Sequence, residues 1–163
     1  MTAMPGRYID SIIETLYGSI SGPASKERNW DQMRTLFLPG SRIMRADVSE
    51  EGCHLSVLLE INEFIESIAG FLCQRGFYGR EVVRRTEISG SIAKVVSVYE
   101  GRFDPDDQKP FRRGTTELKL YNDGQRWWIV NMLLREYRRE DRFSSFSRSK
   151  NTASHGVLTD SLN

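Results

Sequence analysis

The side chains that most often carry out enzyme chemistry are scattered along this chain and form no known motif. His54 is the only histidine before residue 155. It has no adjacent Asp, Cys or second His, so the sequence supports neither a nucleophilic triad nor a metal site. Cys53 and Cys73 have neither CxxC nor metal-ligand spacing, and we interpret them as small buried hydrophobic residues. We therefore expect no bound metal, and we interpret His54 as structural, with a catalytic role as the alternative.

Asn131 is the polar residue with the most informative surroundings, because it interrupts the apolar segment RWWIVNMLL. Strict alternation along a strand puts it on the same face as Trp127, Ile129 and Leu133. Burying an amide without a partner costs about 1–3 kcal/mol. Either a neighbouring backbone group or a tyrosine satisfies Asn131, or its side chain faces a cavity and a ligand. The sequence leaves both open.

Charged residues gather near the ends of two predicted strands. Glu100 and Arg102 end one strand, directly after Tyr99, and Arg112 and Arg113 begin the next strand. Charged side chains usually remain in water. We interpret the cluster as the solvated rim of a hairpin.

The composition narrows the class of protein. A chain of 163 residues suits one domain with a single core. Its 23 Lys and Arg nearly balance its 22 Asp and Glu, whereas nucleic-acid-binding domains usually carry a strong basic excess. We find no apolar run with signal-peptide or membrane-spanning character, and two isolated cysteines fit a reducing compartment. We expect a cytoplasmic protein that binds neither nucleic acid nor a membrane.

The elements that must position these residues follow from hydrophobic periodicity. Apolar residues at helical spacing predict a first helix that ends before Gly22-Pro23, a short second helix from an Asn29 cap to Phe37, and a third helix from an Asn62 cap to Gly76. Two shorter strands are expected at 42–48 and 54–59. Alternation then predicts four long strands at 78–89, 92–104, 111–121 and 126–137, the last two joined by an Asn-Asp-Gly turn. We expect one α+β domain over residues 1–142 and a mobile polar tail over 143–163.

This order of elements resembles the nuclear transport factor two-like superfamily, also called ketosteroid-isomerase-like or cystatin-like. The resemblance covers roughly residues 8–137 and lies in four segments: LYGSISG, NWDQMRTLFLPGSRI, INEFIESIAGFL and DGQRWWIVNML. It implies a cystatin-like cone, in which about three N-terminal helices pack on a strongly curved mixed sheet around an apolar pocket. The superfamily includes isomerases, dehydratases, polyketide cyclases and plain ligand binders, so the fold does not supply the function.

The resemblance also implies where a site would lie. An isomerase of this fold needs a carboxylate base on the first strand and a hydroxyl or protonated acid near it. No acid stands at the expected place, and Asp47, on the same strand face as Arg45, is the substitute. Tyr17 late in the first helix is a candidate hydrogen-bond donor, with a core residue as the alternative. We expect Tyr17, Trp30 and Asn131 together on the pocket wall.

The implied function is the binding of an apolar, ring-containing small molecule. The implied chemistry is that of an isomerase, dehydratase or cyclase that needs acid–base side chains and no cofactor. The alternative is a non-catalytic dimerisation or scaffold module with a vestigial pocket. A titratable pair inside the cavity would separate the two.

The last strand is apolar on both faces, which raises the question of what covers the second face. Alternation directs Trp128, Val130, Met132 and Leu134 away from the helices. Left in water, these side chains would form an unusually large apolar patch for a monomer. We predict a homodimer packed sheet against sheet with Trp128 and Met132 near its centre. The alternative is that long loops of the same chain fold over this face.

Overall fold

The computed structural model describes residues 5–48, 52 and 54–137 of the chain. The helices among these residues are α1 (Pro5–Ile20), α2 (Trp30–Arg34) and α3 (Ile61–Gln74), and none of them is long and apolar enough to cross a membrane. The strands are β1 (Phe37–Val48), β2 (His54–Leu59), β3 (Tyr78–Ser89), β4 (Ile92–Arg102), β5 (Arg112–Asn122) and β6 (Trp127–Glu136). Cys53 and the tail expected over 143–163 lie outside the described residues.

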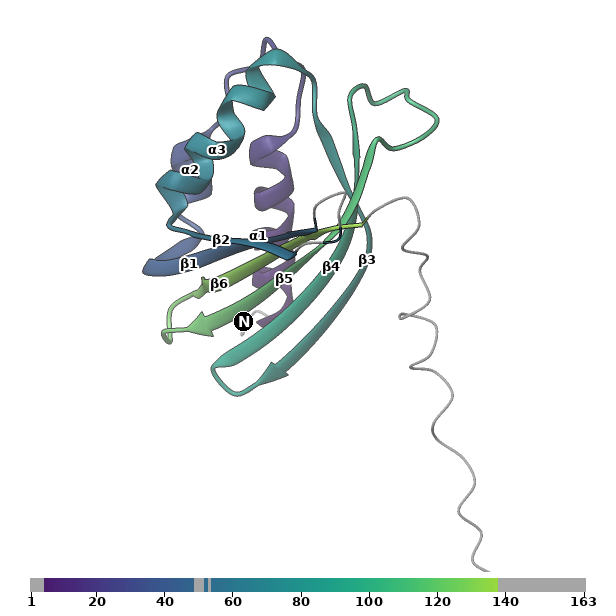
Figure 1. The fold of residues 1–163 in the computed structure, drawn as a ribbon. Coiled ribbons are helices and arrows are strands. Elements are labelled where there is room, and N and C mark those ends of the chain that lie inside the picture. Colours follow the sequence, from purple (N-terminus) through teal and green to yellow (C-terminus); the bar gives the residue numbers. More distant parts are fainter. Residues whose placement is uncertain (1–4, 49–51, 53, 138–163) are drawn as a thin grey trace, which may run out of the picture.

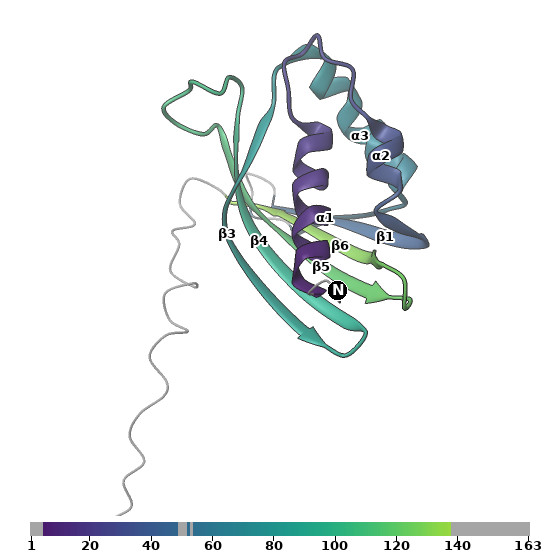
Figure 2. The same ribbon diagram turned by 180° about the vertical axis from the view of Figure 1, so that it is seen from behind.

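The six strands form one curved sheet in the order β2-β1-β6-β5-β4-β3. β1 and β6 run parallel, and all other neighbours in this sheet run antiparallel. Figures 1 and 2 show that the helices lie on the concave side of the sheet. The expected α+β architecture, with three helices and a closing four-stranded meander, is confirmed.

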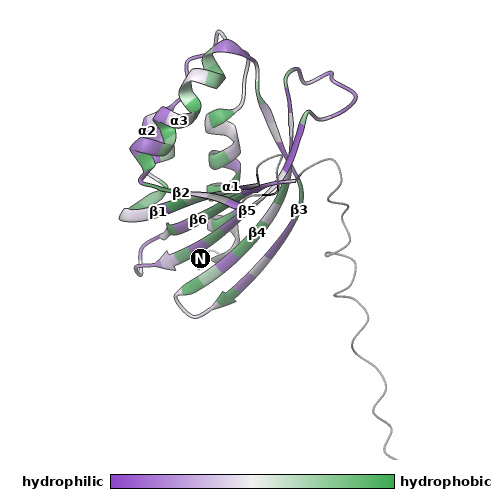
Figure 3. Cartoon of the chain, in the orientation of Figure 1, coloured by the Kyte–Doolittle hydropathy of each residue, from purple (hydrophilic) through white to green (hydrophobic). Residues whose placement is uncertain are grey.

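The helices form where apolar residues recur at helical spacing. In α1 the stripe of Ile9, Ile12, Ile13 and Leu16 is buried in the core that α1 shares with the sheet. The colouring of Figure 3 places apolar residues along α1 and the strands, while the loop between β4 and β5 is hydrophilic. Cys73, which we expected to be buried, is exposed on α3.

Helix capping agrees with the sequence at α2 and differs at α3. The Oδ1 atom of Asn29 accepts from the backbone N–H of Gln32 at 3.0 Å, as expected of an N-cap. The cap expected at Asn62 is wrong, because α3 already begins at Ile61. The N–H of Glu60 donates to Oε2 of Glu63 at 2.8 Å there, a contact typical of a capping box.

The short second helix and the first strand differ from the prediction at their boundary. α2 ends at Arg34, and β1 begins at Phe37 and includes Pro39 and Gly40. Phe37 pairs with Ile129 of β6, and regular pairing resumes only at Arg42. The irregular segment between them accommodates Pro39, whose ring nitrogen cannot donate to a ladder.

A bulge in β6 changes which side chains face the helices. Leu120 of β5 pairs with Ile129, whereas Lys119 pairs with Asn131, so Val130 is an extra residue on β6. Before the bulge the alternation is as predicted, and Trp127 is buried. Beyond the bulge the alternation is reversed.

The reversal corrects two predictions. Met132 is 1% exposed and belongs to the core, and Leu134 packs against that core, so the prediction that both face outward is wrong. Asn131 pairs with Arg42 and Lys119, whose side chains are exposed, on the outer face of the sheet. The prediction that Asn131 and Leu133 face the helices is therefore also wrong.

Candidate functional site: an apolar cavity with a charged rim

A cavity of about 280 Å³ lies between the concave face of the sheet, α1 and α3. Its apolar walls come from both layers and include Leu16, Ile68, Phe71, Phe77, Met132 and Leu134. Known ligand pockets are largely apolar clefts of about 300–1,000 Å³. This cavity lies just below that range and suits a compact ligand.

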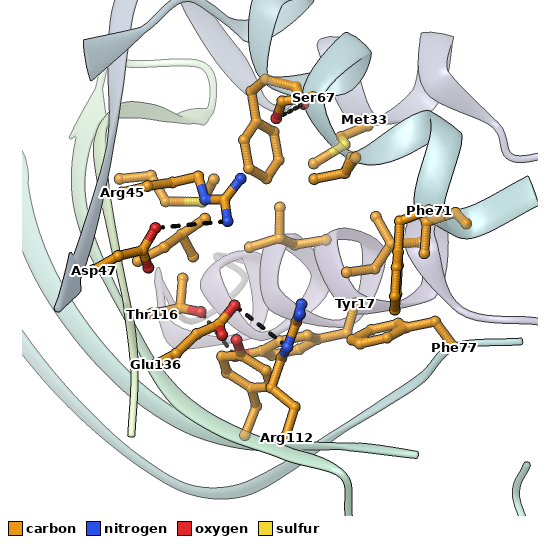
Figure 4. Close-up of a pocket in the computed structure, with 18 residues that line it drawn as sticks. Tyr17, Met33, Arg45, Asp47, Ser67, Phe71, Phe77, Arg112, Thr116 and Glu136 are labelled. Atoms are coloured by element: carbon orange, nitrogen blue, oxygen red, sulfur yellow. Dashed lines mark hydrogen bonds and ion pairs between the residues drawn. The ribbon is translucent and has the colours of Figure 1, made fainter. Parts of the chain in front are cut away.

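Two ion pairs form the charged part of the cavity wall (Figure 4). Nη2 of Arg45 lies 3.8 Å from Oδ2 of Asp47, and Nε of Arg112 lies 3.3 Å from Oε1 of Glu136. All four side chains are between 32% and 40% exposed. They therefore form a half-buried rim, with one pair on β1 and the other between β5 and β6.

Strand parity explains how the rim is assembled. On β1 the alternating residues Ile43, Arg45 and Asp47 face the helices, and Ile43 is fully buried. On β6 the bulge at Val130 brings Glu136 to the same face as Met132. If β6 alternated strictly from Trp127 onward, with no bulge, Glu136 would point away from the cavity.

Tyr17 connects the cavity to a polar network in the wall behind it. Its hydroxyl oxygen lies 2.8 Å from Oγ of Ser97 and 3.3 Å from Oγ1 of Thr116. Ser97 in turn donates to the carboxylate of Glu81. Burial raises the pKa of Tyr17, while the hydrogen bonds to Ser97 and Thr116 act in the opposite direction. Tyr17 therefore stays a neutral phenol at ordinary pH.

Tyr99 lies beside Tyr17 in the cavity wall, with 5.8 Å between the ring centroids. Gly114 makes room for it, because a Cβ atom at that position would lie 2.9 Å from the Tyr99 hydroxyl oxygen. Burial raises the pKa of Tyr99, and the negative charge of Glu136 raises it further. The wall thus holds a second neutral phenol.

Aromatic rings gather where the loop between β4 and β5 meets α3. Phe103 and Phe111 stack with 3.7 Å between their centroids and 5° between their planes. Phe71 of α3 lies 6.2 Å from Phe111, and the guanidinium of Arg112 lies 5.4 Å from the centroids of both Phe71 and Phe111. The loop is therefore held against α3 next to Arg112 of the rim.

The structure brings together only some of the residues that we expected in a site. Tyr17 and Asp47 line the same cavity. His54 is exposed on β2 and does not line the cavity. Trp30 lines a different surface depression, beside Arg28 and Arg34, so its expected place on the pocket wall is wrong.

The side chain of Asn131 bonds to a neighbouring backbone group, which is the first of the two alternatives that the sequence left open. Its Nδ2 donates to the backbone carbonyl of Arg42 at 3.3 Å. A neighbouring strand, and not a ligand, is its partner. The expectation that Asn131 lies on the pocket wall is wrong.

Sequence reasoning missed Tyr99, Arg112 and Glu136, all of which line the cavity. The interpretation of Tyr99 and Arg112 as a solvated rim is wrong for Tyr99, which is buried. The alternation of β4 already puts Tyr99 on the face of Ala93 and Val95, and this signal could have identified it. Glu136 carries no such signal, because its orientation depends on the bulge.

The cavity offers acid–base groups. Two carboxylates and two phenols line it, and the described residues contain no cluster of His, Cys, Asp and Glu that could hold a metal ion. Carboxylates and hydroxyls can transfer or orient protons on a bound molecule. The two carboxylates lie on the rim of the cavity and the two phenols in its wall.

Comparisons with known proteins give the fold. No family model and no curated protein matches the sequence. A cystatin-like protein of unknown function from Nostoc punctiforme is similar over 85% of this chain and 96% of its own, at 8% identity and a TM-score of 0.64. An NTF2-like protein from Cytophaga hutchinsonii covers 82% of this chain and 99% of its own, at 7% identity and a TM-score of 0.61.

A third solved structure, from Novosphingobium aromaticivorans, carries a provisional name as a scytalone dehydratase. It covers 82% of this chain and 84% of its own, at 12% identity and a TM-score of 0.56. Identities this low support the fold and no specific activity. The chain has the cystatin-like α+β fold of the NTF2-like proteins.

Proposed function

We propose that this domain binds a small, apolar, ring-containing molecule in the cavity of the cone. The observation that carries the proposal is the combination of an apolar interior with a half-buried charged rim. Apolar side chains of α1, α3 and β6 would contact the rings. The rim and the two phenols would orient polar groups of the molecule, as the few polar groups of ligand pockets usually do.

The chemistry that these side chains support is proton transfer without a cofactor, of isomerase, dehydratase or cyclase type. Asp47 is the proposed base, because it lines the cavity and is paired with Arg45 only across 3.8 Å. The provisional dehydratase name of the structure from N. aromaticivorans agrees with this class of reaction. A base must reach the proton that it removes, and Asp47 on the rim would act on an atom near the cavity mouth.

The binding proposal is tested by NMR with a library of one-ring and two-ring aromatic compounds. Binding should shift the backbone amide signals of Tyr17, Ile68 and Met132. Ile68→Trp, which fills the cavity from α3, should abolish these shifts. Glu66→Trp adds the same side chain at an exposed position of α3 and should leave binding unchanged. A library that shifts no cavity signal in the wild-type protein would overturn the proposed function.

A second candidate function, homodimerisation, is favoured by the outer face of the sheet. Exposed apolar side chains there include Leu58 at 63%, Tyr121 at 41% and Val130 at 37%. They lie on β2, β5 and β6, three strands of the order β2-β1-β6-β5, on the side opposite the helices. Such a surface suits a second copy of the chain, whether or not the cavity is used.

A further inference from the structure

The hydroxyl proton of Tyr17 is already engaged inside the cavity wall. The direction of the hydrogen bonds follows from Glu81, which stands at the far end of the network. Nε of Arg84 donates to both carboxylate oxygens of Glu81 at 3.0 Å, and Nη2 lies 2.7 Å from Oε1. Glu81 is thus the carboxylate partner of an ion pair, and a carboxylate can only accept hydrogen bonds.

Ser97 must therefore donate to Glu81, and it has a single hydroxyl proton. Its oxygen is left as an acceptor, so Tyr17 is the donor in the 2.8 Å contact between the two hydroxyls. The longer contact of 3.3 Å runs from the Tyr17 hydroxyl to Oγ1 of Thr116 and uses the same proton. Figure 4 shows Tyr17 and Thr116 together in the wall of the cavity.

We propose that Tyr17 acts toward the ligand as a hydrogen-bond acceptor, so that the cavity selects ring-containing molecules that carry a hydroxyl or N–H group at this point. Molecules with only an ether or carbonyl oxygen there would meet a lone pair of Tyr17 and bind less tightly. This inference rests on the proposed function. It reverses the role expected from the sequence, in which Tyr17 was a donor.

The network also indicates how the selectivity could be inverted. In Glu81→Gln the amide oxygen would face the donors of Arg84, and the amide N–H would face Ser97. Ser97 would then accept from Gln and direct its own proton to Tyr17. The proton of Tyr17 would be released from Ser97 and become available to a ligand. The variant keeps the size of the side chain, removes its negative charge and reverses the direction of donation between this side chain and Ser97.

The probes for this test are 2-naphthol and its methyl ether, which share the same rings and differ in the hydroxyl proton. Dissociation constants are measured by NMR titration, and the readout is the ratio of the ether value to the naphthol value. Because each protein is compared with itself, the extra methyl group contributes equally throughout. One net hydrogen bond corresponds to roughly a 3- to 10-fold difference in affinity.

We expect the wild-type ratio to favour naphthol by about this factor. Tyr17→Phe should lose most of the preference, and Glu81→Gln should reduce it or reverse it. Ser97→Ala, which removes the acceptor of the Tyr17 proton, should act in the same direction as Glu81→Gln. The matched controls are Tyr121→Phe and Glu87→Gln, both at exposed positions, and they should keep the wild-type ratio.

The outcomes separate this inference from the proposed function. If both probes bind in the cavity with equal affinity, or if Tyr17→Phe keeps the preference for naphthol, the acceptor role is wrong and the binding function stands. An unchanged preference in both Glu81→Gln and Ser97→Ala also overturns the acceptor role. If neither probe shifts a cavity signal in the wild-type protein, the binding function fails for this ring class and the inference fails with it.

Discussion

At the scale of single residues, Arg28 shows how one buried charge can hold a connection in place. Its side chain is 6% exposed and donates to four backbone carbonyls, among them Ile20 at 3.0 Å and Gly22 at 3.0 Å. These carbonyls belong to the end of α1 and the loop that follows it. We expect Arg28→Ala to lower the free energy of unfolding by about 2–4 kcal/mol, because it leaves buried carbonyls without a charged donor.

Urea denaturation followed by circular dichroism measures this loss. The control is Arg85→Ala, at an exposed position where the guanidinium pairs with Glu87 across 2.8 Å. Exposed ion pairs contribute little, so this control should lose less than about 1 kcal/mol. Equal losses for the two variants would contradict the structural role of Arg28.

A second prediction at this scale concerns alkaline pH and Tyr99. Burial raises the pKa of Tyr99 above its ordinary value of 10.0, and the charge of Glu136 adds to the effect. An unfolded chain would lose the proton first as the pH rises, so the native state binds more protons there. The stability contributed by the neutral phenol is complete below pH 10 and falls as the pH rises beyond it.

Melting temperatures measured from pH 8 to pH 11.5 test this effect. We expect a smaller alkaline decrease for Tyr99→Phe than for the wild-type protein. Tyr121→Phe, which removes an exposed phenol, should follow the wild-type curve. Parallel curves for all three proteins would show that the Tyr99 hydroxyl is not desolvated in the native state.

At the scale of elements, the bulge at Val130 decides which half of β6 faces the cavity. Deleting Val130 would remove only the extra residue, so Asn131 would still pair with Lys119 on the outer face and Met132 would stay in the core. Inserting one alanine between Asn131 and Met132 would instead reverse the alternation and turn Met132 and Leu134 outward. Exposing one large apolar side chain costs about 1.5–3 kcal/mol, so we expect the insertion to cost at least about 3 kcal/mol. Val130→Ala, which keeps the chain length at this 37% exposed position, should cost less than about 1 kcal/mol in the same urea experiment.

The bulge also marks the limit of what the sequence could predict. Local patterns predicted the helices, the meander and the inward orientation of Trp127, because each depends on periodicity within one element. The pairing of Lys119 with Asn131 depends on two strands and on the core beneath them. No local signal in WWIVNMLL distinguishes the extra residue from its neighbours. For that reason Tyr17 and Asp47 were placed near the cavity, whereas Glu136 was missed.

At the scale of the whole molecule, the bulge changes which side chains could form the predicted dimer interface. The outer face of the sheet is still where we expect that interface. Met132 and Leu134 lie on the inner face, so they cannot contact a second sheet. Trp128 does point outward, but the guanidinium of Arg126 lies 3.9 Å from its ring centroid. Its indole N–H donates to Oδ2 of Asp123 at 2.9 Å. Trp128 is thus partly covered by its own chain.

Val130 and Leu133 are the better probes of this outer surface. Val130 comes directly before Asn131, Leu133 comes two residues after it, and both lie on the outer side of β6. We expect the wild-type protein to sediment as a homodimer in analytical ultracentrifugation at micromolar concentration. Val130→Glu with Leu133→Glu should give a folded monomer, because four added charges, two from each copy, would have to be desolvated across the interface.

Met132→Glu supplies the contrast, since it places a carboxylate in the core instead of on the outer face. It should unfold the protein, whereas the double variant should keep the wild-type circular dichroism spectrum. This difference separates a lost interface from a lost fold. A wild-type protein that remains monomeric at high micromolar concentration would show that the apolar outer face is not an interface between copies of this chain. Ligand binding in the cone, on the opposite face of the sheet, would be unaffected by that result.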